Sequence, residues 1–405
     1  MGSARFEDAY PARCHFPISG IVVKIRVIRL VDRFTFSVAQ WSLGGSAGCK
    51  EATTRCLWYK YNEKHLMKSS TPLLEISDLR TVFYKDEGVL NAVDGINLAI
   101  QEGQIFGLVG ESGSGKTVTA LSIMNLIEEP GEIVSGSIHF RGVSLLKLTE
   151  DEMAEFRGDQ ISMVFQDPQI RLNPVFPIGD QIVEIFTLHK GLDRKEAKKQ
   201  TISKMELVGI PDPDWMMGAY AHQLSGGQAQ RVMIAMAIAL KPELIIADEP
   251  TSALDVTIQA QILKLFDELN ASDATSILLI SHDLGVIAGL ADRVAVMYAG
   301  VIVEEAEVES LFEHRLHPYT GGLIASLPNP EEKLDRLRNI PGALLDRADL
   351  PPGCRFSPRC GARVEFGLTI CESYEPDIIE RSPGHIVRCW LYQDGDGQRA
   401  PLRSG

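Results

Sequence analysis

Apolar residues follow two different spacings between residues 72 and 310, and the two spacings alternate along the chain. Compact apolar runs bounded by glycine or polar turns predict β-strands at 74–83, 92–100, 105–109, 244–247 and 277–280, and a final hairpin at 295–303. Apolar residues three and four positions apart predict a helix over 117–127 and a mostly helical stretch over 149–240. Buried strands that alternate with helices are typical of an α/β fold, in which helices cover a mostly parallel sheet.

The two flanks of this region lack its alternation. Residues 1–66 contain scattered tryptophans and cysteines and no rhythm of turns, strands and helices. We consider a genuine N-terminal extension and, as the favoured interpretation, a translation start at Met67, just before the first predicted strand. Residues 311–405 are rich in proline and cysteine, which predicts an irregular accessory segment. The predicted parts are therefore 1–66, 72–310 and 311–405.

Composition narrows the class of protein. The chain has 405 residues, of which 45% are hydrophobic and 23% are charged, with a formal net charge of −14. This is globular composition, and the acidic balance disfavours a sequence-independent nucleic-acid binder. No run of about 18 uncharged apolar residues is present, so we expect no membrane span and no secretory signal. For a chain in the reducing cytosol, the seven cysteines are expected to be thiols or metal ligands.

One segment fits the pattern G-x-x-x-x-G-K-[ST] between a predicted strand and a predicted helix. Its residues are Gly110, Glu111, Ser112, Gly113, Ser114, Gly115, Lys116 and Thr117. The glycines allow backbone N–H groups to surround a phosphate, and the helix N-terminus adds partial positive charge. Lys116 is expected to reach the β- and γ-phosphates, and the Thr117 hydroxyl to bind Mg²⁺. A merely connecting turn would not need the lysine and the threonine.

Two carboxylates follow the predicted strand 244–247. Asp248 and Glu249 would lie at the carboxyl end of that strand, where α/β folds bind ligands. Asp248 suits Mg²⁺, which prefers oxygen ligands. Glu249 suits the attacking water, as a general base or as the group that positions it. Two exposed carboxylates at a strand end are the simpler alternative, and the upstream phosphate loop argues against it.

A second candidate for phosphate binding precedes another predicted helix. It consists of Ser225, Gly226, Gly227 and Gln228, which follow Leu224. A serine and two glycines before a helix can bind an anion, although a capping serine with a flexible glycine pair explains the same residues.

Together these motifs resemble the nucleotide-binding subunits of ABC transporters. Residues 224–228 match the family signature LSGGQ, Gln166 matches a glutamine that contacts metal and water, and His282 matches the switch histidine. Residues 252–255, which end in Asp255, match the loop that crosses to the partner subunit. Phe83 stands where the family stacks an aromatic ring on adenine, with Tyr84 as the alternative.

The resemblance implies a cassette fold and a set of roles. The expected fold is a P-loop core of the RecA-like type with an antiparallel β subdomain and a helical subdomain that carries the signature. The catalytic residues would be Glu249, His282 and Gln166, and Mg²⁺ would be held by Thr117, Gln166 and Asp248. Each ATP would lie between the phosphate loop of one chain and the signature of another, so a monomer should hydrolyse ATP poorly.

The resemblance extends to the oligopeptide/dipeptide importer branch through residues 166–168, 172–174, 317–320, 340–342 and 353–360. It implies import of di- or oligopeptides at the cytoplasmic face of the membrane. The implied partners are two membrane permeases, an extracytoplasmic binding protein and a second ATPase subunit, for which a paralogue is favoured. Import of nickel or another small solute is the alternative on the same cassette. A soluble ABC protein of translation or DNA repair is disfavoured by the single phosphate loop.

Four cysteines lie close together near the C-terminus. They are Cys354, Cys360, Cys371 and Cys389. Their spacing differs from the paired C-x₂-C pattern of a zinc ribbon, whereas a [4Fe–4S] cluster tolerates varied spacing. The cluster is the favoured interpretation, and zinc or metal-free buried thiols are the alternatives.

Overall fold

The computed structural model describes residues 71–86, 88–252, 254–327, 340–342 and 350–393. All of them belong to one compact unit. The predicted segment 1–66, the alternative start at Met67 and residue 253 of the predicted crossing loop lie outside the described residues.

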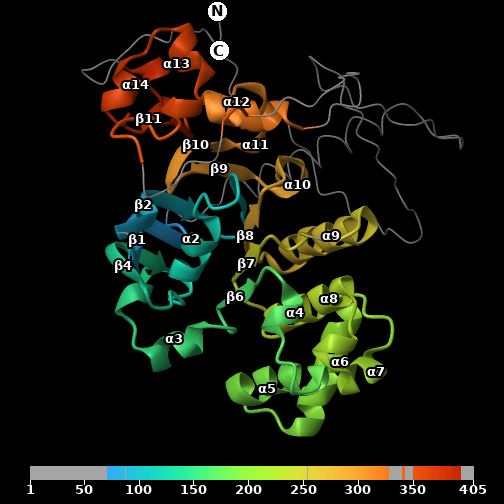
Figure 1. Cartoon of the computed structure of the whole chain (residues 1–405). Coiled ribbons are helices and arrows are strands. Elements are labelled where there is room, and N and C mark those ends of the chain that lie inside the picture. Colours follow the sequence, from blue (N-terminus) through green and yellow to red (C-terminus); the bar gives the residue numbers. More distant parts are fainter. Residues whose placement is uncertain (1–70, 87, 253, 328–339, 343–349, 394–405) are drawn as a thin grey trace, which may run out of the picture. The chain divides into compact units, whose positions relative to one another are not determined.

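A mixed sheet forms the centre of this unit (Figure 1). Its strand order is β11-β12-β10-β9-β3-β8-β7-β6. Strands β9, β3, β8, β7 and β6 pair in parallel, and β10, β12 and β11 add an antiparallel edge. The bounds are β3 Ile105–Val109, β6 Ile161–Val164, β7 Leu244–Asp248, β8 Ser276–Ser281, β9 Arg293–Tyr298, β10 Val301–Glu307, β11 Ile379–Ser382 and β12 His385–Val387.

A second, antiparallel sheet has the order β2-β1-β4-β5. Its strands are β1 Leu74–Lys85, β2 Gly88–Ile100, β4 Gly131–Phe140 and β5 Val143–Ser144. Both sheets confirm the predicted fold class, and β1 and β2 confirm the two predicted N-terminal strands. The sequence interpretation missed β4, which is largely exposed and carries few apolar residues in regular alternation.

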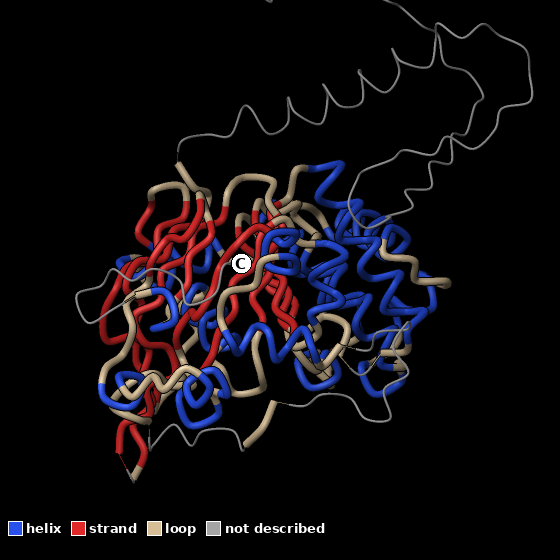
Figure 2. The backbone as a smooth tube through the Cα atoms, turned by 90° about the horizontal axis from the view of Figure 1, so that it is seen from above, coloured by secondary structure: helices blue, strands red, loops and turns tan. Residues whose placement is uncertain are grey.

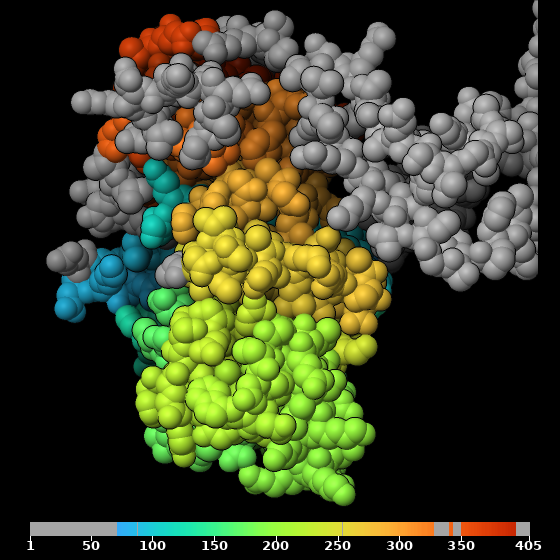
Figure 3. Space-filling view, turned by 90° about the vertical axis from the view of Figure 1, so that its right-hand side faces the viewer, coloured from blue at the N-terminus to red at the C-terminus, as the bar shows by residue number. Residues whose placement is uncertain are grey.

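Helices cover the central sheet and form a separate group beside it. Figure 2 shows a large group of helices on one side and the strands on the other, with shorter helices beside the strands. Helices α4 to α8 make up the helical subdomain, which Figure 3 shows as a contiguous green surface next to α9. The bounds are α2 Lys116–Ile123, α3 Glu150–Phe156, α4 Pro168–Arg171, α5 Ile178–Lys190, α6 Arg194–Leu207, α7 Pro213–Gly218, α8 Gly226–Ala237, α9 Val256–Asp273 and α10 Leu284–Leu290. None of the helices in the described ranges is long and apolar enough to cross a membrane.

The central strands are buried on both faces, and alternate residues pack into different cores. In β8, Ile277 and Leu279 belong to the core shared with the helices, whereas Leu278 and Ile280 belong to the core shared with the antiparallel sheet. This double burial explains why β3, β7 and β8 read as continuous apolar runs in the sequence.

The C-terminal region consists of short elements that dock on β10. They are α11 Val308–Glu313, α12 Pro318–Ala325, a 3₁₀ turn Ser357–Arg359, α13 Gly361–Glu365, α14 Ile370–Ser373 and the hairpin β11–β12. The buried carboxylate of Glu304 in β10 accepts hydrogen bonds from the backbone N–H groups of Leu316 (2.6 Å) and His317 (2.9 Å). Its Oε1 also pairs with His385 Nε2 of β12 at 2.8 Å. These contacts attach the region to the central sheet.

Candidate nucleotide site

The phosphate loop, residues 110–117, connects β3 to α2 at the carboxyl end of the central sheet. Only glycine fits at position 110, because a Cβ there would lie 2.1 Å from the carbonyl oxygen of Met297. Gly113 and Gly115 have φ of 77° and 113°, which side-chain-bearing residues rarely adopt. The backbone thus follows a path that glycine permits, and it ends at the N-terminus of α2.

Lys116 begins α2 and lies across the loop. Its side chain is buried, and its Nζ donates hydrogen bonds to the carbonyl oxygens of Gly110 at 2.9 Å and Glu111 at 3.0 Å. A buried ammonium group beside the N-terminus of a helix suits a phosphate chain. Thr117 follows it and is exposed to the pocket.

Asp248 is the last residue of β7, and only 1% of it is exposed. Burial raises the pKa of its carboxyl group to about 6, an effect that a hydrogen bond from Thr117 partly offsets. Its Oδ1 has no hydrogen-bond partner among the described residues. A buried carboxylate oxygen without a partner, next to a threonine hydroxyl, fits a Mg²⁺ ligand set.

Glu249 follows directly and has an unusual backbone conformation, with φ of 47°. Such strain in a non-glycine residue is concentrated at functional sites. Its Oε2 accepts a hydrogen bond from Gln166 Nε2 at 3.3 Å and lies 3.2 Å from His282 Nδ1. Two side chains that follow the strands on either side of β7 therefore meet at the Glu249 carboxylate.

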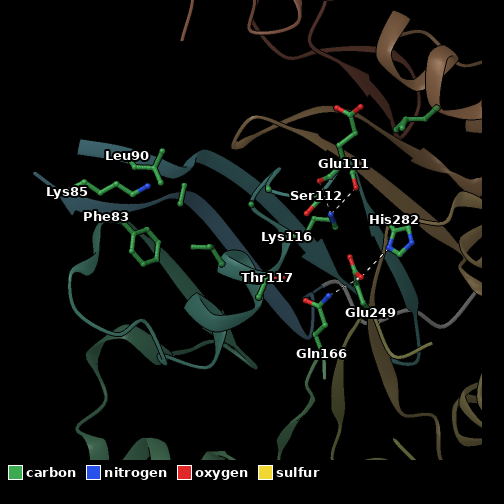
Figure 4. Close-up of a pocket in the computed structure, with 16 residues that line it drawn as sticks. Phe83, Lys85, Leu90, Glu111, Ser112, Lys116, Thr117, Gln166, Glu249 and His282 are labelled. Atoms are coloured by element: carbon green, nitrogen blue, oxygen red, sulfur yellow. Dashed lines mark hydrogen bonds and ion pairs between the residues drawn. The ribbon is translucent and has the colours of Figure 1, made fainter. Parts of the chain in front are cut away.

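A pocket of about 830 Å³, shown in Figure 4, is lined by the phosphate loop together with Gln166, Glu249 and His282, whereas Asp248 is not among its lining residues. Phe83 forms part of its wall, whereas Tyr84 does not line it and instead donates a hydrogen bond to Glu132 at 3.1 Å. The lining residues are Phe83, Lys85, Leu90, Ala92, Gly110, Glu111, Ser112, Gly113, Gly115, Lys116, Thr117, Val118, Gln166, Glu249, His282 and Leu323. Ser114 is buried behind this wall, and its Oγ has no hydrogen-bond partner within the described part of the chain.

The signature residues do not line this pocket. Ser225 caps α8: its Oγ accepts from the N–H of Gln228 at 3.3 Å, and Gln228 Oε1 accepts from the N–H of Ser225 at 2.9 Å. Gly226 is exposed and Gly227 is half-buried at the start of α8. Asp255 caps α9 through the N–H groups of Thr257 and Ile258, both at 3.0 Å. In the single chain these residues are helix caps.

Two residues that the sequence interpretation did not assign to the site contact the phosphate loop. The N–H of Glu111 donates to the hydroxyl of Tyr319 at 2.8 Å, and Arg359 donates to the Glu111 carboxylate at 2.7 and 3.0 Å. Both belong to motifs noted only as part of the C-terminal resemblance. Their local sequence carries no signal of a contact more than 200 residues away.

The four C-terminal cysteines lie in one region without forming a site for a single ion. Burial is the main cause that raises the pKa of each thiol, to about 12 for Cys354 and about 11 for Cys371, and above the ordinary value for Cys360 and Cys389. Each of these thiols influences another electrostatically. In the described ranges, no three Cys, His, Asp or Glu side chains are arranged to hold one metal ion.

The chain combines a glycine-rich loop that carries a buried lysine, two acidic residues at the end of β7 and a separate signature segment. This combination defines an ABC-type ATP-binding cassette. The family model described as ABC transporter matches residues 93–252. A second model, described as oligopeptide/dipeptide transporter, C-terminal region, matches residues 303–366.

This chain aligns with its relatives over most of their length. The oligopeptide transport ATP-binding protein AppD of Bacillus subtilis is 45% identical over 81% of this chain and 99% of its own. The oligopeptide transport ATP-binding protein OppD of Haemophilus influenzae is 44% identical over 79% of this chain and 97% of its own. The chain therefore belongs to the family of ABC transporter ATP-binding proteins that carry the oligopeptide/dipeptide C-terminal region. It is an ATPase whose ligands are ATP and Mg²⁺.

Solved structures share the cassette. The dimeric post-hydrolysis structure of the ATP-binding cassette MJ0796, bound to ADP and Pi, has a TM-score of 0.54 and 26% identity. It covers 58% of this chain and 98% of that one. The structure of cbiO1 from Clostridium perfringens, part of the ABC transporter complex cbiONQ, has a TM-score of 0.51 and 25% identity and covers 61% and 92%.

Proposed function

We propose that this chain is the ATP-hydrolysing subunit of an importer for di- and oligopeptides, and that it couples ATP turnover to transport through membrane permeases. The observation that carries the hydrolytic part is the convergence of Gln166 and His282 on Glu249, in the same pocket as the phosphate loop. In this proposal residues 72–310 form the cassette and residues 311–405 its C-terminal region.

The loop end of the pocket binds the nucleotide. Backbone N–H groups of residues 110–117 and the Nζ of Lys116 hold the phosphates, and Lys116 exchanges its two carbonyl partners for phosphate oxygens. Phe83 stacks on the adenine, since it is the aromatic ring in the pocket wall at that end.

The carboxylate end carries out the chemistry. Asp248, Thr117 and Gln166 would hold Mg²⁺, which neutralises charge on the β- and γ-phosphates. Glu249 accepts a proton from the attacking water or orients it, and Gln166 and His282 hold that carboxylate in place. His282 is 60% exposed, so its other ring nitrogen can face the γ-phosphate.

A second cassette completes the site. Residues Ser225, Gly226, Gly227 and Gln228 would contact the ATP of a partner subunit, and Asp255 would contact that partner across the interface. The exposure of Ser225 and Gly226 supports this assignment, as does the dimeric form of the cassette MJ0796. We propose a paralogous chain as the partner.

The transported substrate follows from the relatives, whose names include oligopeptide transport and dipeptide transport ATP-binding proteins. Two membrane permeases and an extracytoplasmic binding protein would supply specificity, with the chain bound at the cytoplasmic face of the membrane. Exposed apolar side chains at Ile170, Val175 and Phe176 offer a docking surface for a permease, since monomeric proteins rarely expose such groups together. Import of nickel or another small solute is the alternative.

The test uses the complex purified from native membranes, with its binding protein, and measures ATP turnover with a peptide pool or with nickel chelates. Stimulation by peptides alone supports the proposal, whereas stimulation by nickel alone replaces the substrate and keeps the catalytic roles. A complex that carries Lys116→Ala controls for contaminating ATPases. Absence of a co-purifying permease would contradict the transporter role.

We further propose that Cys354, Cys360, Cys371 and Cys389 bind one [4Fe–4S] cluster with a structural role. Their proximity supports this, because a cluster separates its four sulfur ligands more widely than a single ion does. A bound cation would also offset the burial that keeps these thiols protonated. Anaerobically purified protein should contain iron and should absorb broadly at about 400 nm, as iron–sulfur clusters do. Zinc in its place, or no metal, would overturn the cluster.

A further inference from the structure

Glu111, the second residue of the phosphate loop, is held at each of its polar groups. Its N–H donates to the Tyr319 hydroxyl at 2.8 Å, and its carbonyl oxygen accepts from Lys116 Nζ at 3.0 Å. Its carboxylate accepts two parallel hydrogen bonds from Arg359, at 2.7 and 3.0 Å. Glu111 is thus fixed in position by partners from the loop itself and from the C-terminal region.

The two C-terminal partners are themselves rigidly packed. Tyr319 is fully buried, and its ring lies 4.7 Å from that of Tyr298 and 5.4 Å from that of Phe356. The Arg359 side chain is only 5% exposed and lies over the Tyr298 ring at 5.8 Å. Its Nε donates to the carbonyl oxygen of Pro341 at 3.0 Å. Two buried groups in a defined orientation can therefore define where Glu111 lies.

Charge gives the Arg359 contact a further consequence. A free carboxylate beside the phosphate loop would repel the phosphates of a nucleotide. Arg359 pairs with it in a bidentate arrangement, and that hydrogen bond is the main cause that raises the pKa of the guanidinium group. Figure 4 shows the Glu111 carboxylate pointing away from Lys116, toward the C-terminal region. The negative charge is both neutralised and turned away from the pocket.

We propose that Arg359 and Tyr319 are positioning residues for ATP binding, which act through Glu111 to hold the phosphate loop in the form that receives the triphosphate. The inference rests on the proposed function of the loop as the ATP site. Neither residue lines the pocket, so neither is assigned a contact with the nucleotide.

The experiment measures, for the full chain, the dissociation constant of Mg²⁺–ATP by calorimetry and the deuterium uptake of loop peptides in the absence of nucleotide. Arg359→Met should weaken ATP binding about tenfold, because one charge-assisted hydrogen-bond pair is lost. The loop amides should also exchange faster. The ATP affinity of Arg359→Lys should fall between those of the parent and Arg359→Met, since lysine keeps the positive charge and loses the bidentate guanidinium geometry.

Arg293→Met is the matched control. Arg293 of β9 also joins the central sheet to the C-terminal region, because it donates to the carbonyl oxygen of Gly384. It pairs with Glu305 of the adjacent strand β10 at 2.6 Å, and no hydrogen bond joins it to the phosphate loop among the described residues. It should leave ATP affinity within twofold. In a Glu111→Gln background, Arg359→Met should change affinity less than in the parent, because Arg359 acts through that carboxylate.

Tyr319→Phe keeps the ring packing and removes only the acceptor of the Glu111 N–H. It therefore tests the proposal even if Arg359→Met fails to fold. It should weaken ATP binding about threefold and speed exchange at Glu111, as expected for one neutral hydrogen bond. Parental affinity and parental loop exchange in folded Arg359→Met, or in Tyr319→Phe, would overturn the inference while the ATP site stands. Failure of the parent chain itself to bind ATP would overturn the proposed function.

Discussion

The chain contains two glycine-rich turns that each lead into a helix, the phosphate loop before α2 and the signature segment before α8. Their sequences suggest the same use, yet their surroundings differ. The phosphate loop is held from several sides: Met297 leaves no room at Gly110, Lys116 bonds to two loop carbonyls, and the N–H of Gly300 donates to the carbonyl of Ser114 at 2.8 Å.

The signature segment, residues 224–228, has few contacts from outside itself among the described residues: Gln169 Nε2 donates to the carbonyl oxygen of Leu224 at 3.2 Å, and the Ile258 side chain lies beside Gly227. Ser225 and Gln228 cap each other, and an added Cβ at Gly226 would meet no heavy atom within 4 Å among the described residues. The contrast teaches that one turn acquires its shape from the rest of the chain, whereas the other is left accessible. An accessible anion-binding turn suits a nucleotide brought by a second subunit, as proposed above.

The largest expected effect separates binding at the phosphate loop from turnover. Glu249→Gln in the assembled complex should lower ATP turnover by about 10²–10⁴, because the amide cannot accept the proton of water. ATP affinity at the loop should stay within about threefold. Glu243→Gln is the control and should leave turnover unchanged, because Glu243 is a half-buried carboxylate that pairs with Arg141 and does not line the pocket. Turnover by Glu249→Gln within twofold of the parent would contradict the role.

The next effect concerns the carboxylate buried beside the loop. The pKa of Asp248 rises from 3.8 to about 6 on folding because of burial, so the folded state binds this proton more tightly than the unfolded state. The contribution of Asp248 to the free energy of unfolding of the nucleotide-free chain should therefore fall by about 2 kcal/mol as pH rises from 4 to 6.

Urea unfolding of the Mg²⁺-free chain at each pH measures this dependence. Asp248→Asn should flatten it, and Asp255→Asn, which changes the exposed cap of α9, should not. An equal slope in the parent and in Asp248→Asn would assign the pH dependence to other groups.

A pair of truncations compares the two turns directly. Lys116→Ala should weaken ATP binding by the single chain by about 1.5–3 kcal/mol, since a buried charged donor is lost. Gln228→Ala removes half of a capping box and should leave that affinity within twofold. Calorimetric titration of both variants gives the comparison. Equal losses of affinity would mean that the signature contributes to binding within one chain.

The smallest expected effect concerns the space available for a side chain at the two glycine-rich turns. Gly110→Ala should lower the free energy of unfolding by about 1–3 kcal/mol, because its Cβ collides with the Met297 carbonyl oxygen. Gly226→Ala should change it by no more than about 0.5 kcal/mol. Chemical unfolding measures both. A Gly110→Ala variant as stable as the parent would show that the loop is less confined than described.

Local patterns were sufficient for the elements that place the site. The apolar runs predicted β3, β7 and β8. The roles of Gln166 and His282 were implied by the family resemblance, and both residues line one pocket with Lys116 and Glu249. The helix predicted over 117–127 is shorter, since α2 ends at Ile123. The stretch 149–240 also contains β6, a four-residue strand too short to alter the helical periodicity around it.

The remaining features depend on contacts between distant residues. Nothing in the spacing around Tyr319 or Arg359 indicates that they reach Glu111, because such contacts depend on how separate elements pack. The elevated pKa of Asp248 likewise follows from its burial at the end of β7. The sequence identified that carboxylate, and only the packed structure determines its protonation.

The attachment of the C-terminal region to Glu111 has a consequence for biosynthesis. His282 is the last of the nucleotide motifs to be translated, but Arg359 follows Glu111 by 248 residues. At roughly 5–20 residues per second, a ribosome needs on the order of 10–50 s to travel between them. A nascent chain thus carries the phosphate loop for that time before Arg359 emerges to hold it, and the last nucleotide motif, at His282, precedes Arg359 by 77 residues. The phosphate loop, among the first motifs to be synthesised, is among the last to reach its final set of contacts.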